Sequence, residues 1–474
     1  MNKNNNRVKE NKRIIVVLAC LCTMLVVLIG YLSYFQVFKA QEVKNNAYNK
    51  RTWINEENVL RGSILDRNGN VLVYNKKTED SNKRYYKYGR LYSHVIGYSY
   101  REYGKTGLEL KYNNALLDIS DSTALNDLKS LILPTSIGND LKLTIDHNLQ
   151  EKSRSLLEGK KGAIVAMNPK TGEVYSMVSM PDFDTSNLND HWKGITESED
   201  SPLLNRATQG LYAPGSVFKV ITTVAALDTP ALDNEYKCSG TAKIDGYTFK
   251  DYSSRGHGNI TLEDALRLSC NTYYVDRVQY IGKDRLGSTA DKFMINSKID
   301  FDLPMKSSSF PYKKSLSKTE LSASAIGQGE VLVTPLNMAM VASAIANDGQ
   351  MVKPILVKEI VSKNNRILES YSTEVISDVT SSIKANQIKD MMLKVVESGT
   401  GTNAKIKNVK VAGKTGTAEN PSGKSHSWFI GFAPYDDPKI AIAVILEEEG
   451  VTGGTGAAPI ARDIFIHGLN NIDF

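Results

Sequence analysis

Hydrophobic residues are unevenly distributed along this chain, and the longest apolar run lies near the N-terminus. From Ile14 to Phe38 there is no charged residue, and roughly 20 apolar residues are enough for a helix to span a bilayer. Basic residues precede the run, so the positive-inside rule predicts a cytoplasmic tail at residues 1–13. The pattern therefore predicts a single transmembrane anchor at residues 14–38, with the rest of the chain outside the cytoplasm. A cleaved signal peptide is the alternative, but no small-x-small cleavage site follows the run.

The segment after the anchor, residues 39–137, is polar and rich in Tyr, Asn and Lys. Strand-like runs at 62–65 and 71–74 flank the turn sequence Asp-Arg-Asn-Gly at 66–69, which predicts a β-hairpin. The hairpin indicates a small N-terminal module rather than a large core.

Residues 138–474 have the pattern of a larger α+β domain. Alternation predicts a strand at 140–145, a helix follows at 148–157, and residues 200–400 are mostly helical in pattern. Further strands are predicted at 162–167, 173–178, 409–414, 428–433 and 440–447, with a last helix at 458–468. Strands at both ends with helices between them predict one antiparallel sheet in which the first and last segments meet.

Composition and charge argue against a nucleic-acid-binding function. The chain has 474 residues, of which 41% are hydrophobic and 23% charged, as in ordinary globular proteins. The formal net charge of +6 is spread along the chain, without a dense Lys/Arg block. We therefore expect no nucleic-acid partner.

The first candidate for chemistry is Ser216, in the sequence Pro-Gly-Ser-Val-Phe-Lys at 214–219. Ser216 and Lys219 are three residues apart, so a helix would place them on one face. A serine hydroxyl becomes a nucleophile when a base removes its proton, and burial can lower the pKa of a lysine enough for it to serve. The spacing alone is weak, because Ser-x-x-Lys recurs at 315–318 and 381–384.

Two later motifs give Ser216 its context. Ser269 and Asn271 follow a predicted helix, so their side chains can project from its end. Lys-Thr-Gly also occurs at 105–107 and 170–172, but only Lys414 continues a predicted strand, with Thr415, Gly416 and Thr417 next to it. A glycine in that strand would let a ligand approach the backbone closely.

In this order, Ser-x-x-Lys, Ser-x-Asn and Lys-Thr-Gly form the signature of the penicillin-recognising serine acyltransferases. The chain resembles a class B penicillin-binding protein, a monofunctional peptidoglycan D,D-transpeptidase, over almost its full length after the anchor. Further stretches that carry the resemblance are 61–69, 107–109, 205–207, 327–329 and 428–434. The resemblance implies an antiparallel sheet with flanking helices and an all-helical subdomain. It also implies a dimerisation-type pedestal at 39–137 and a transpeptidase domain at 138–474.

The same resemblance implies the reaction and the catalytic roles. Ser216 would attack the D-Ala-D-Ala carbonyl of a peptidoglycan stem peptide, with Lys219 as its base. Ser269 would relay a proton to the leaving amine, and Asn271 would bind the substrate backbone. β-Lactams would trap Ser216 as a slow ester.

For substrate binding, the resemblance implies that Lys414 holds the proton network and the substrate carboxylate by its charge. Thr415 and Thr417 hydroxyls would assist it beside Gly416, and the backbone N–H groups of Ser216 and Thr417 would form the oxyanion hole. The acyl transfer would require no cofactor. Expected partners are stem peptides, lipid-linked nascent strands and a membrane glycosyltransferase of the SEDS type.

Four residues outside these motifs form a candidate metal site. Cys238, Asp251, His257 and Cys270 have the spacing C-x12-D-x5-H-x12-C, and these residue types suit a tetrahedral zinc ion. A Cys238–Cys270 disulfide and two free thiols remain open alternatives outside the cytoplasm. Two other cysteines, at 20 and 22, lie in the predicted anchor, where small apolar residues are expected.

Other functions are compatible with parts of the pattern. A β-lactamase or a β-lactam sensor would share the fold, but the sequence lacks a Glu-x-x-Leu-Asn run for deacylation and a cytoplasmic signalling segment. A non-catalytic cell-wall scaffold would not need the combination of Ser216, Lys219, Ser269 and Lys414. The sequence leaves open whether the role is in elongation, division or sporulation.

Overall fold

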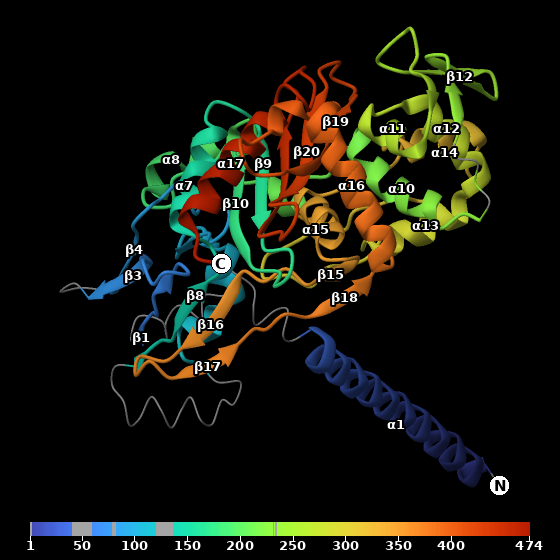
Figure 1. Ribbon diagram of the computed structural model, residues 1–474. Helices are drawn as coiled ribbons and strands as arrows, with labels where there is room; N and C mark the ends of the chain where they lie inside the picture. The colour runs from blue at the N-terminus through green and yellow to red at the C-terminus, as the bar shows by residue number, and fades with distance from the viewer. Residues whose placement is uncertain (1, 40–58, 78–81, 120–135, 231, 233–234) are drawn as a thin grey trace.

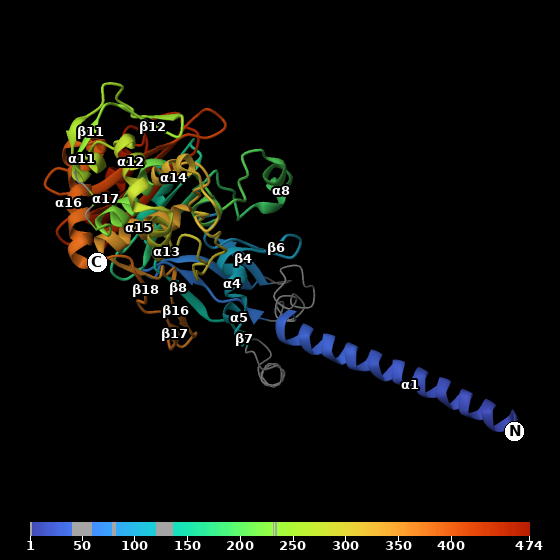
Figure 2. The ribbon, with the colours of Figure 1, turned by 90° about the vertical axis from the view of Figure 1, so that its right-hand side faces the viewer.

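The N-terminal helix stands apart from the rest of the chain. The computed structural model describes residues 2–39, 59–77, 82–119, 136–230, 232 and 235–474. Helix α1 (Asn2–Tyr34) continues into the π-helical turn η1 (Phe35–Lys39) and projects from the folded body (Figures 1 and 2). Its apolar part, Lys12–Lys39, is long enough to cross a membrane and is not buried anywhere in the fold. Residue 1 of the expected tail and residues 40–58, 78–81 and 120–135 of the expected pedestal lie outside the described residues.

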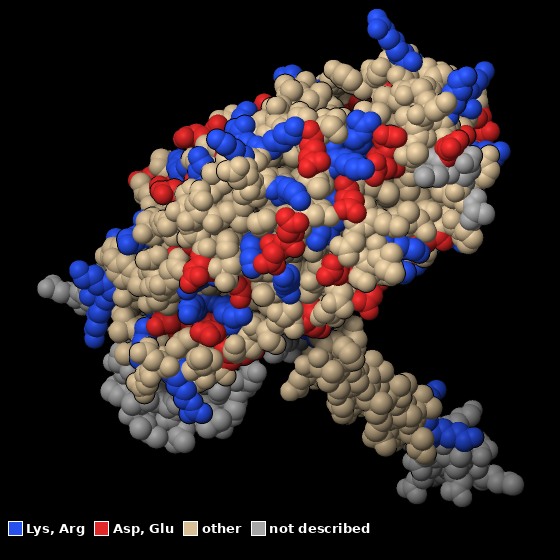
Figure 3. All heavy atoms as spheres, in the orientation of Figure 1, with Lys and Arg blue, Asp and Glu red and all other residues tan. Residues whose placement is uncertain are grey.

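The charges differ between this helix and the body. Figure 3 shows α1 tan over most of its length, with blue Lys and Arg atoms near the end that is farthest from the body, whereas both signs are intermixed on the visible face of the body. A bilayer would favour the uncharged part of this helix, from Ile14 onward, and water would favour the mixed-charge surface of the body.

A five-stranded antiparallel sheet forms the centre of the body. Its strand order is β10-β9-β21-β20-β19. The bounds are β9 Gly162–Met167, β10 Val174–Met180, β19 Ala412–Ala418, β20 His426–Ala433 and β21 Ile440–Leu446. The early strand β9 pairs with the late strand β21, so the first and last segments meet as the sequence predicted.

Helices cover both faces of this sheet. Helices α7 (His147–Leu156) and α17 (Ala457–Asn471) pack on one face, and α15 (Pro335–Ala346) packs on the other. Successive residues of a strand point to opposite faces; accordingly Val444 joins the apolar cluster of α17 and Ala443 the cluster of α15. Every residue of α15 is buried, because this apolar helix separates the sheet from the helical subdomain.

The region from 200 to 400 contains the predicted helices and, in its described part, eight short strands that the pattern did not predict. The helical segments are α9 Arg206–Gln209, η2 Gly215–Phe218, α10 Lys219–Leu227, α11 Leu262–Arg267, α12 Asn271–Ile281, α13 Lys283–Lys292, α14 Lys318–Ala325 and α16 Ser382–Ser398. The strands are β11 Tyr236–Cys238, β12 Thr241–Ile244, β13 Tyr247–Lys250, β14 Gly258–Ile260, β15 Gln350–Val352, β16 Val357–Val361, β17 Ile367–Ser370 and β18 Val375–Asp378. Strands of three to five residues carry too little alternation to be read from sequence.

A second sheet joins the pedestal to the larger domain. Its six strands have the order β17-β16-β8-β2-β3-β4. The early strands are β2 Ile64–Leu65, β3 Val71–Lys77, β4 Asn82–Tyr86 and β8 Asp140–Leu143. The predicted β2–β3 hairpin is present, and β2 also pairs in parallel with β8. Strands from both sides of the expected 137/138 boundary therefore share one sheet.

The remaining described elements are short and lie around these sheets. They are β1 Val59–Leu60, β5 Ser99–Tyr100, β6 Gly104–Lys105, α4 Gly107–Lys111, α5 Asn113–Leu116, β7 Ser136–Ile137, α8 Leu188–Glu197 and η3 Thr402–Ala404.

A buried ion cluster holds the pedestal together. The Glu109 carboxylate lies 2.6 Å from Arg61 Nε and 2.7 Å from Arg84 Nε, and all three side chains are almost fully buried. Burial alone would raise the pKa of Glu109, but the two guanidinium groups outweigh it and the pKa is lowered. Two of the stretches that carried the family resemblance, at 61–69 and 107–109, thus meet in this cluster.

Replacing Glu109 with glutamine should destabilise the pedestal strongly. Two guanidinium groups would remain buried without a counter-charge, which costs about 3–5 kcal/mol. Hydrogen exchange of β3 amides in the full chain measures the loss as a lower free energy of local unfolding. As a matched control, Lys170→Gln breaks a pair with Asp437 in which both side chains are 55% exposed, and should cost about 0–1 kcal/mol. Equal effects of both variants would contradict this role of the cluster.

Candidate active site

Ser216 lies in a tight turn at the start of a buried helix. The turn is the 3-10 helix η2, which runs directly into α10. Gly215 has a φ of 55°, a left-handed conformation that favours glycine, and its N–H donates to the carbonyl of Gly327 over 2.8 Å. Ser216 is partly buried, and among the described residues no protein group hydrogen-bonds its hydroxyl. The turn therefore presents this hydroxyl to whatever enters the site.

Lys219 is fully buried one helical turn beyond Ser216. Its Nζ lies 2.8 Å from the Ser269 carbonyl oxygen, 3.3 Å from Ser269 Oγ and 2.7 Å from Asn271 Oδ1. Burial lowers the pKa of Lys219 to about 8, against the opposing effect of two acidic groups nearby. The amine is thus oriented by the Ser-x-Asn segment rather than by Ser216 in this state.

Ser269 connects two helices in a left-handed conformation. Its φ of 58° ends α11 and redirects the chain before α12 begins. As a result, Ser269 Oγ lies 2.8 Å from Lys414 Nζ as well as 3.3 Å from Lys219 Nζ. One hydroxyl therefore bridges the two lysines that the sequence predicted.

Lys414 lies inside β19 rather than at the end of a strand. The predicted strand at 409–414 is shifted, because β19 begins at Ala412 and continues through the whole Lys-Thr-Gly-Thr motif to Ala418. All seven residues of β19 pair with residues of β20, and in this register Lys414 lies opposite Ile430. The Lys414 side chain is fully buried, and its Nζ also donates to the Thr415 carbonyl over 2.8 Å.

The amines of two buried lysines lie close to one hydroxyl, Ser269 Oγ. Burial lowers the pKa of Lys414 well below its usual value, and the charge of Lys219 lowers it further. The pKa of Lys219 is lowered as well. Two buried ammonium groups around one hydroxyl repel each other, so the pair is more stable with one proton fewer. Loss of one proton from this pair would leave a neutral amine beside Ser269 Oγ.

The rest of the Lys-Thr-Gly-Thr motif lines the edge of the sheet beside the Ser216 turn. A Cβ on Gly416 would come within 2.9 Å of the Pro214 carbonyl oxygen, so this glycine allows the close contact between β19 and η2. Thr415 is buried and its hydroxyl lies 2.6 Å from the Thr400 hydroxyl. Thr417 is exposed at the free edge of β19 and its hydroxyl accepts from Gly453 N–H over 3.3 Å.

The competing copies of these motifs lie elsewhere. Lys105 is buried in the pedestal, and Lys170 lies at the β9–β10 hairpin and pairs with Asp437 over 2.7 Å. Ser381 caps α16, and Ser315 is an exposed loop residue. Only the set chosen by order and context converges on one edge of the central sheet.

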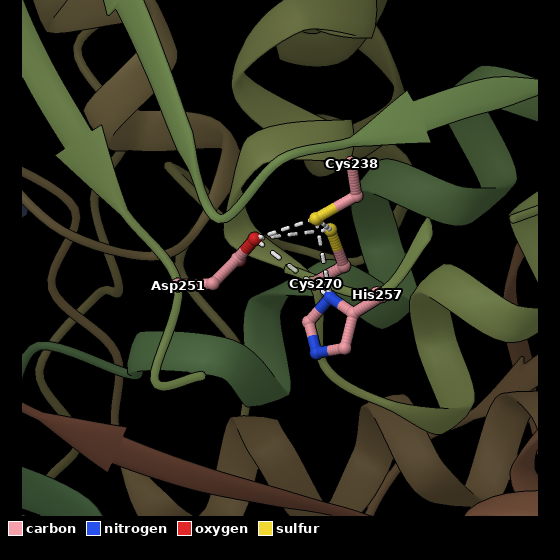
Figure 4. A group of neighbouring side chains, drawn as sticks. All are labelled: Cys238, Asp251, His257 and Cys270. Atoms are coloured by element: carbon pink, nitrogen blue, oxygen red, sulfur yellow. Dashed lines mark hydrogen bonds and ion pairs between the residues drawn. The ribbon is translucent and has the colours of Figure 1, made fainter. Parts of the chain in front are cut away.

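The four candidate metal ligands form one cluster next to this site. Figure 4 shows their side chains pointing toward one another. Their donor atoms all lie within 4.8 Å of one another. Cys238 Sγ is 3.0 Å from Asp251 Oδ2, 3.3 Å from His257 Nδ1 and 3.7 Å from Cys270 Sγ. The two sulfurs are not bonded. Burial, and then the charge of Asp251, raise the pKa of the Cys270 thiol to about 12.

The cluster is joined to the catalytic segment through Asp251. Its Oδ2 faces the thiols, while its Oδ1 accepts from the backbone N–H of Asn271 and, over 3.2 Å, from that of Thr272. The side chain of Cys270 caps α12 by accepting from Tyr273 N–H. A change in the cluster would therefore reach the segment that orients Lys219.

Three residues that the sequence did not point to also contact the catalytic motifs or the Cys238–Asp251–His257–Cys270 cluster. Thr272 Oγ1 lies 2.9 Å from Asp251 Oδ2, and the Tyr274 ring centroid lies 5.5 Å from Lys219 Nζ. Thr400 contacts the Lys-Thr-Gly-Thr motif from outside it. Nearness to Asn271 in the sequence could have suggested the first two, whereas nothing in the sequence pointed to Thr400.

Comparison with known families gives two matches. Residues 162–465 match the penicillin binding protein transpeptidase domain, and residues 61–137 match the penicillin binding protein A dimerisation domain. The chain is 31% identical to the peptidoglycan D,D-transpeptidase PbpA of Mycolicibacterium smegmatis, over 94% of this chain and 96% of the relative. It is also 31% identical to the peptidoglycan D,D-transpeptidase MrdA of Acinetobacter baumannii, over 83% of this chain and 67% of the relative.

Solved structures agree in fold. Penicillin-binding protein A from M. tuberculosis, solved as a ceftriaxone acyl-enzyme complex, superposes with a TM-score of 0.81 at 28% identity, covering 88% of this chain and 100% of that one. The D,D-transpeptidase domain of a peptidoglycan glycosyltransferase from Eggerthella lenta gives a TM-score of 0.79 at 34% identity, covering 87% of this chain and 99% of that one.

Proposed function

The chain belongs to the class B penicillin-binding proteins, and on this premise we propose that it is a serine-type peptidoglycan D,D-transpeptidase with Ser216 as nucleophile. The observation that carries the assignment is the meeting of three distant motifs at one hydroxyl, Ser269 Oγ, within reach of Lys219 and Lys414. A structural role alone would not require two buried lysines whose pKa values are both lowered.

Acylation would begin with proton transfer from Ser216 to Lys219. A neutral Lys219 amine has two N–H bonds, and the Ser269 carbonyl and Asn271 Oδ1 can accept both. Its lone pair then remains for the hydroxyl proton of Ser216. The Ser216 oxygen attacks the carbonyl carbon of the penultimate D-Ala, and the terminal D-Ala leaves with a proton delivered through Ser269.

Substrate binding would favour this proton distribution. A D-Ala carboxylate near Lys414 stabilises the proton on Lys414, which leaves Lys219 neutral. Because Lys414 is fully buried, direct hydrogen bonds to the carboxylate would come from the exposed Thr417 hydroxyl, with Thr415 behind it. The Ser216 and Thr417 N–H groups would hold the developing oxyanion. An amine of a neighbouring strand then takes the acyl group and frees Ser216.

Mapping of a covalent adduct tests the nucleophile directly. Full-length protein labelled with a fluorescent penicillin should yield one labelled peptide, with the adduct on Ser216. Ser315 and Ser381 belong to the other Ser-x-x-Lys sequences and serve as internal controls. Labelling of either, or of no serine, would contradict the proposal. A long-lived ester also separates a transpeptidase from a β-lactamase, and any ester at all argues against a non-catalytic scaffold.

Acylation should depend on pH through Lys219. Its pKa is lowered to about 8, so the base is protonated below that pH and neutral above it. The second-order rate constant of acylation should rise about ten-fold per pH unit at low pH and level off above about pH 8. Stopped-flow labelling across this range measures it, with thermal unfolding at each pH as the control for folding. A flat profile would contradict the assignment of Lys219 as base.

We further propose that Cys238, Asp251, His257 and Cys270 hold a structural zinc ion. In a tetrahedral site with Zn–S bonds of about 2.3 Å, the two sulfurs would be about 3.8 Å apart. The observed separation is 3.7 Å, and the 3.5 Å between Cys270 Sγ and Asp251 Oδ2 also matches the edge of about 3.5 Å that a tetrahedral site gives, whereas Cys238 Sγ lies closer to this oxygen, at 3.0 Å. Such an ion would fix Asp251 and Cys270, and through them the segment that orients Lys219.

Zinc content should follow these ligands. Purified full-length protein should bind about one zinc ion per chain. Loss of a residue that only supports a metal ligand can weaken metal binding by roughly 100-fold. Because His257 would be a ligand itself, His257→Ala should weaken zinc binding by more than that. Metal analysis, with thiol titration before and after a chelator, measures both. His191→Ala, in α8, is the matched control and should leave the zinc content unchanged. Absence of zinc together with two freely reactive thiols would end the proposal.

The anchor and the domain division complete the proposed arrangement. We propose that residues 1–13 are cytoplasmic, 14–38 span the membrane, 39–137 form the pedestal and 138–474 the extracytoplasmic transpeptidase domain. Lipid-linked nascent strands would reach Ser216 near the membrane surface, supplied by a SEDS-type glycosyltransferase. Co-purification of a polytopic glycosyltransferase with the full chain, but not with a chain lacking residues 1–38, tests the partnership.

A further inference from the structure

Two buried thiols from separate elements touch each other beside the active site. Cys238 ends β11 and Cys270 caps α12, and their sulfurs lie 3.7 Å apart with 3% and 0% of each residue exposed. We propose that Cys238 and Cys270 form a reversible disulfide that excludes zinc and slows acylation of Ser216. The inference goes beyond the proposed transpeptidase and concerns its regulation, and its functional part rests on the proposed acylation.

The geometry favours bond formation. A disulfide needs a sulfur–sulfur distance of about 2.05 Å, so the two atoms must approach by about 1.7 Å. Rotation of two side chains can supply this movement, because the sulfurs already face each other (Figure 4). Residues outside the cytoplasm meet oxidising conditions. His257 Nδ1 lies 3.3 Å from Cys238 Sγ and its side chain is 14% exposed, so we expect an oxidant to reach the pair beside this residue.

The chemistry balances with a peroxide as oxidant. Two thiols give up two protons and two electrons to form the S–S bond, and hydrogen peroxide takes them to become two water molecules. Exchange with an oxidised dithiol protein would achieve the same result, with that protein reduced. A bound zinc ion uses both sulfurs as ligands, so metal binding and disulfide formation exclude each other.

The disulfide would disturb the catalytic segment. Cys270 lies between Ser269 and Asn271, the two residues that orient Lys219. Moving its sulfur toward Cys238 withdraws the cap from α12, whose Tyr273 N–H now lies 3.4 Å away. Misplacement of a catalytic group by about 1 Å can cost about 100-fold in rate. We therefore expect at least about a ten-fold slower acylation in the oxidised protein.

The experiment uses the detergent-solubilised full chain carrying Cys20→Ser and Cys22→Ser, so that the anchor contributes no thiol. After removal of metal with a chelator, hydrogen peroxide should link the peptides containing Cys238 and Cys270, as seen by mass spectrometry without reduction. The acylation rate with fluorescent penicillin should fall at least about ten-fold and return after treatment with dithiothreitol. Zinc added first should prevent both changes.

Cys238→Ser in the same background is the matched control, because its acylation rate should not respond reversibly to peroxide. The disulfide between Cys238 and Cys270 is detected in the chain that keeps both cysteines. The outcome therefore does not depend on whether the Cys238→Ser variant folds well. A missing linkage, or a linkage with an unchanged acylation rate, would overturn the proposal. Failure of the reduced chain to label at Ser216 would instead refute the proposed transpeptidase and leave the linkage result standing.

Discussion

Replacing Ser216 with alanine should abolish the covalent penicillin adduct and lower the transpeptidation rate by at least about 10⁴-fold. The reason is that the reaction proceeds through an ester on this oxygen, and no other hydroxyl in the described site has the same position. Ser269 is the nearest alternative, but its Oγ is held between Lys414 Nζ and Lys219 Nζ and belongs to the proton path. Gel fluorescence after penicillin labelling, and release of D-Ala from a stem peptide, measure the two losses.

The matched control for this variant is Ser315→Ala. Ser315 precedes Lys318 with the same spacing, and its side chain is exposed in a loop. It should leave labelling and D-Ala release unchanged, because nothing in the site contacts it. Residual labelling of Ser216→Ala near the unmodified level would show that another residue is the nucleophile.

The central sheet could be predicted because its strands are long and apolar. The β9–β10 hairpin and the last two strands were each visible as runs of alternating or apolar residues, and their pairing followed from strands lying at both ends of the domain. The start of β19 was predicted three residues too early. Val409, Lys410 and Val411 alternate like a strand, but in the structure Ile406 forms only an isolated bridge with Val409. Local alternation does not reveal which residues have a neighbouring strand to pair with.

The second sheet could be predicted only in part: the β2–β3 hairpin and the strand at β8 were expected, but their joining with β16 and β17 was not, for a related reason. Its strands β16 and β17 lie more than 200 residues after β8, and each is only four or five residues long. Pairing of such short strands is decided by contacts that are distant in sequence. The expected division of the chain at 137/138 follows the family resemblance, and hydrogen bonding between β2 and β8 crosses it.

The catalytic residues could be selected from sequence only by the order and context of the motifs. Motif order and context could not predict the backbone and side-chain geometry that brings these residues into contact. The left-handed φ of Ser269 is one example, since serine rarely adopts it and no local pattern announces it. The burial of both lysines is another, because lysine is ordinarily an exposed residue. These are the features that lower the two pKa values and bring Ser269 Oγ between the amines.

Replacing Lys219 with methionine should lower the second-order rate constant of acylation by about 10²–10⁴-fold, the range expected for loss of a general base. Methionine keeps much of the volume in this fully buried position and removes the amine. The rise of the acylation rate toward pH 8 should disappear with it. Penicillin labelling followed in time across the pH range measures both changes.

A second variant at the same position separates basicity from charge. Lys219→Arg retains a cation that can donate to the Ser269 carbonyl and to Asn271 Oδ1, but arginine does not lose its proton in proteins. If Lys219 acts as a base, the arginine variant should be as slow as the methionine variant. Lys384→Met should be unaffected, because Lys384 pairs with Asp228 at the opposite end of α10 from the Ser216 turn. An arginine variant with near-normal acylation would mean that the positive charge, rather than a free amine, is what Ser216 requires.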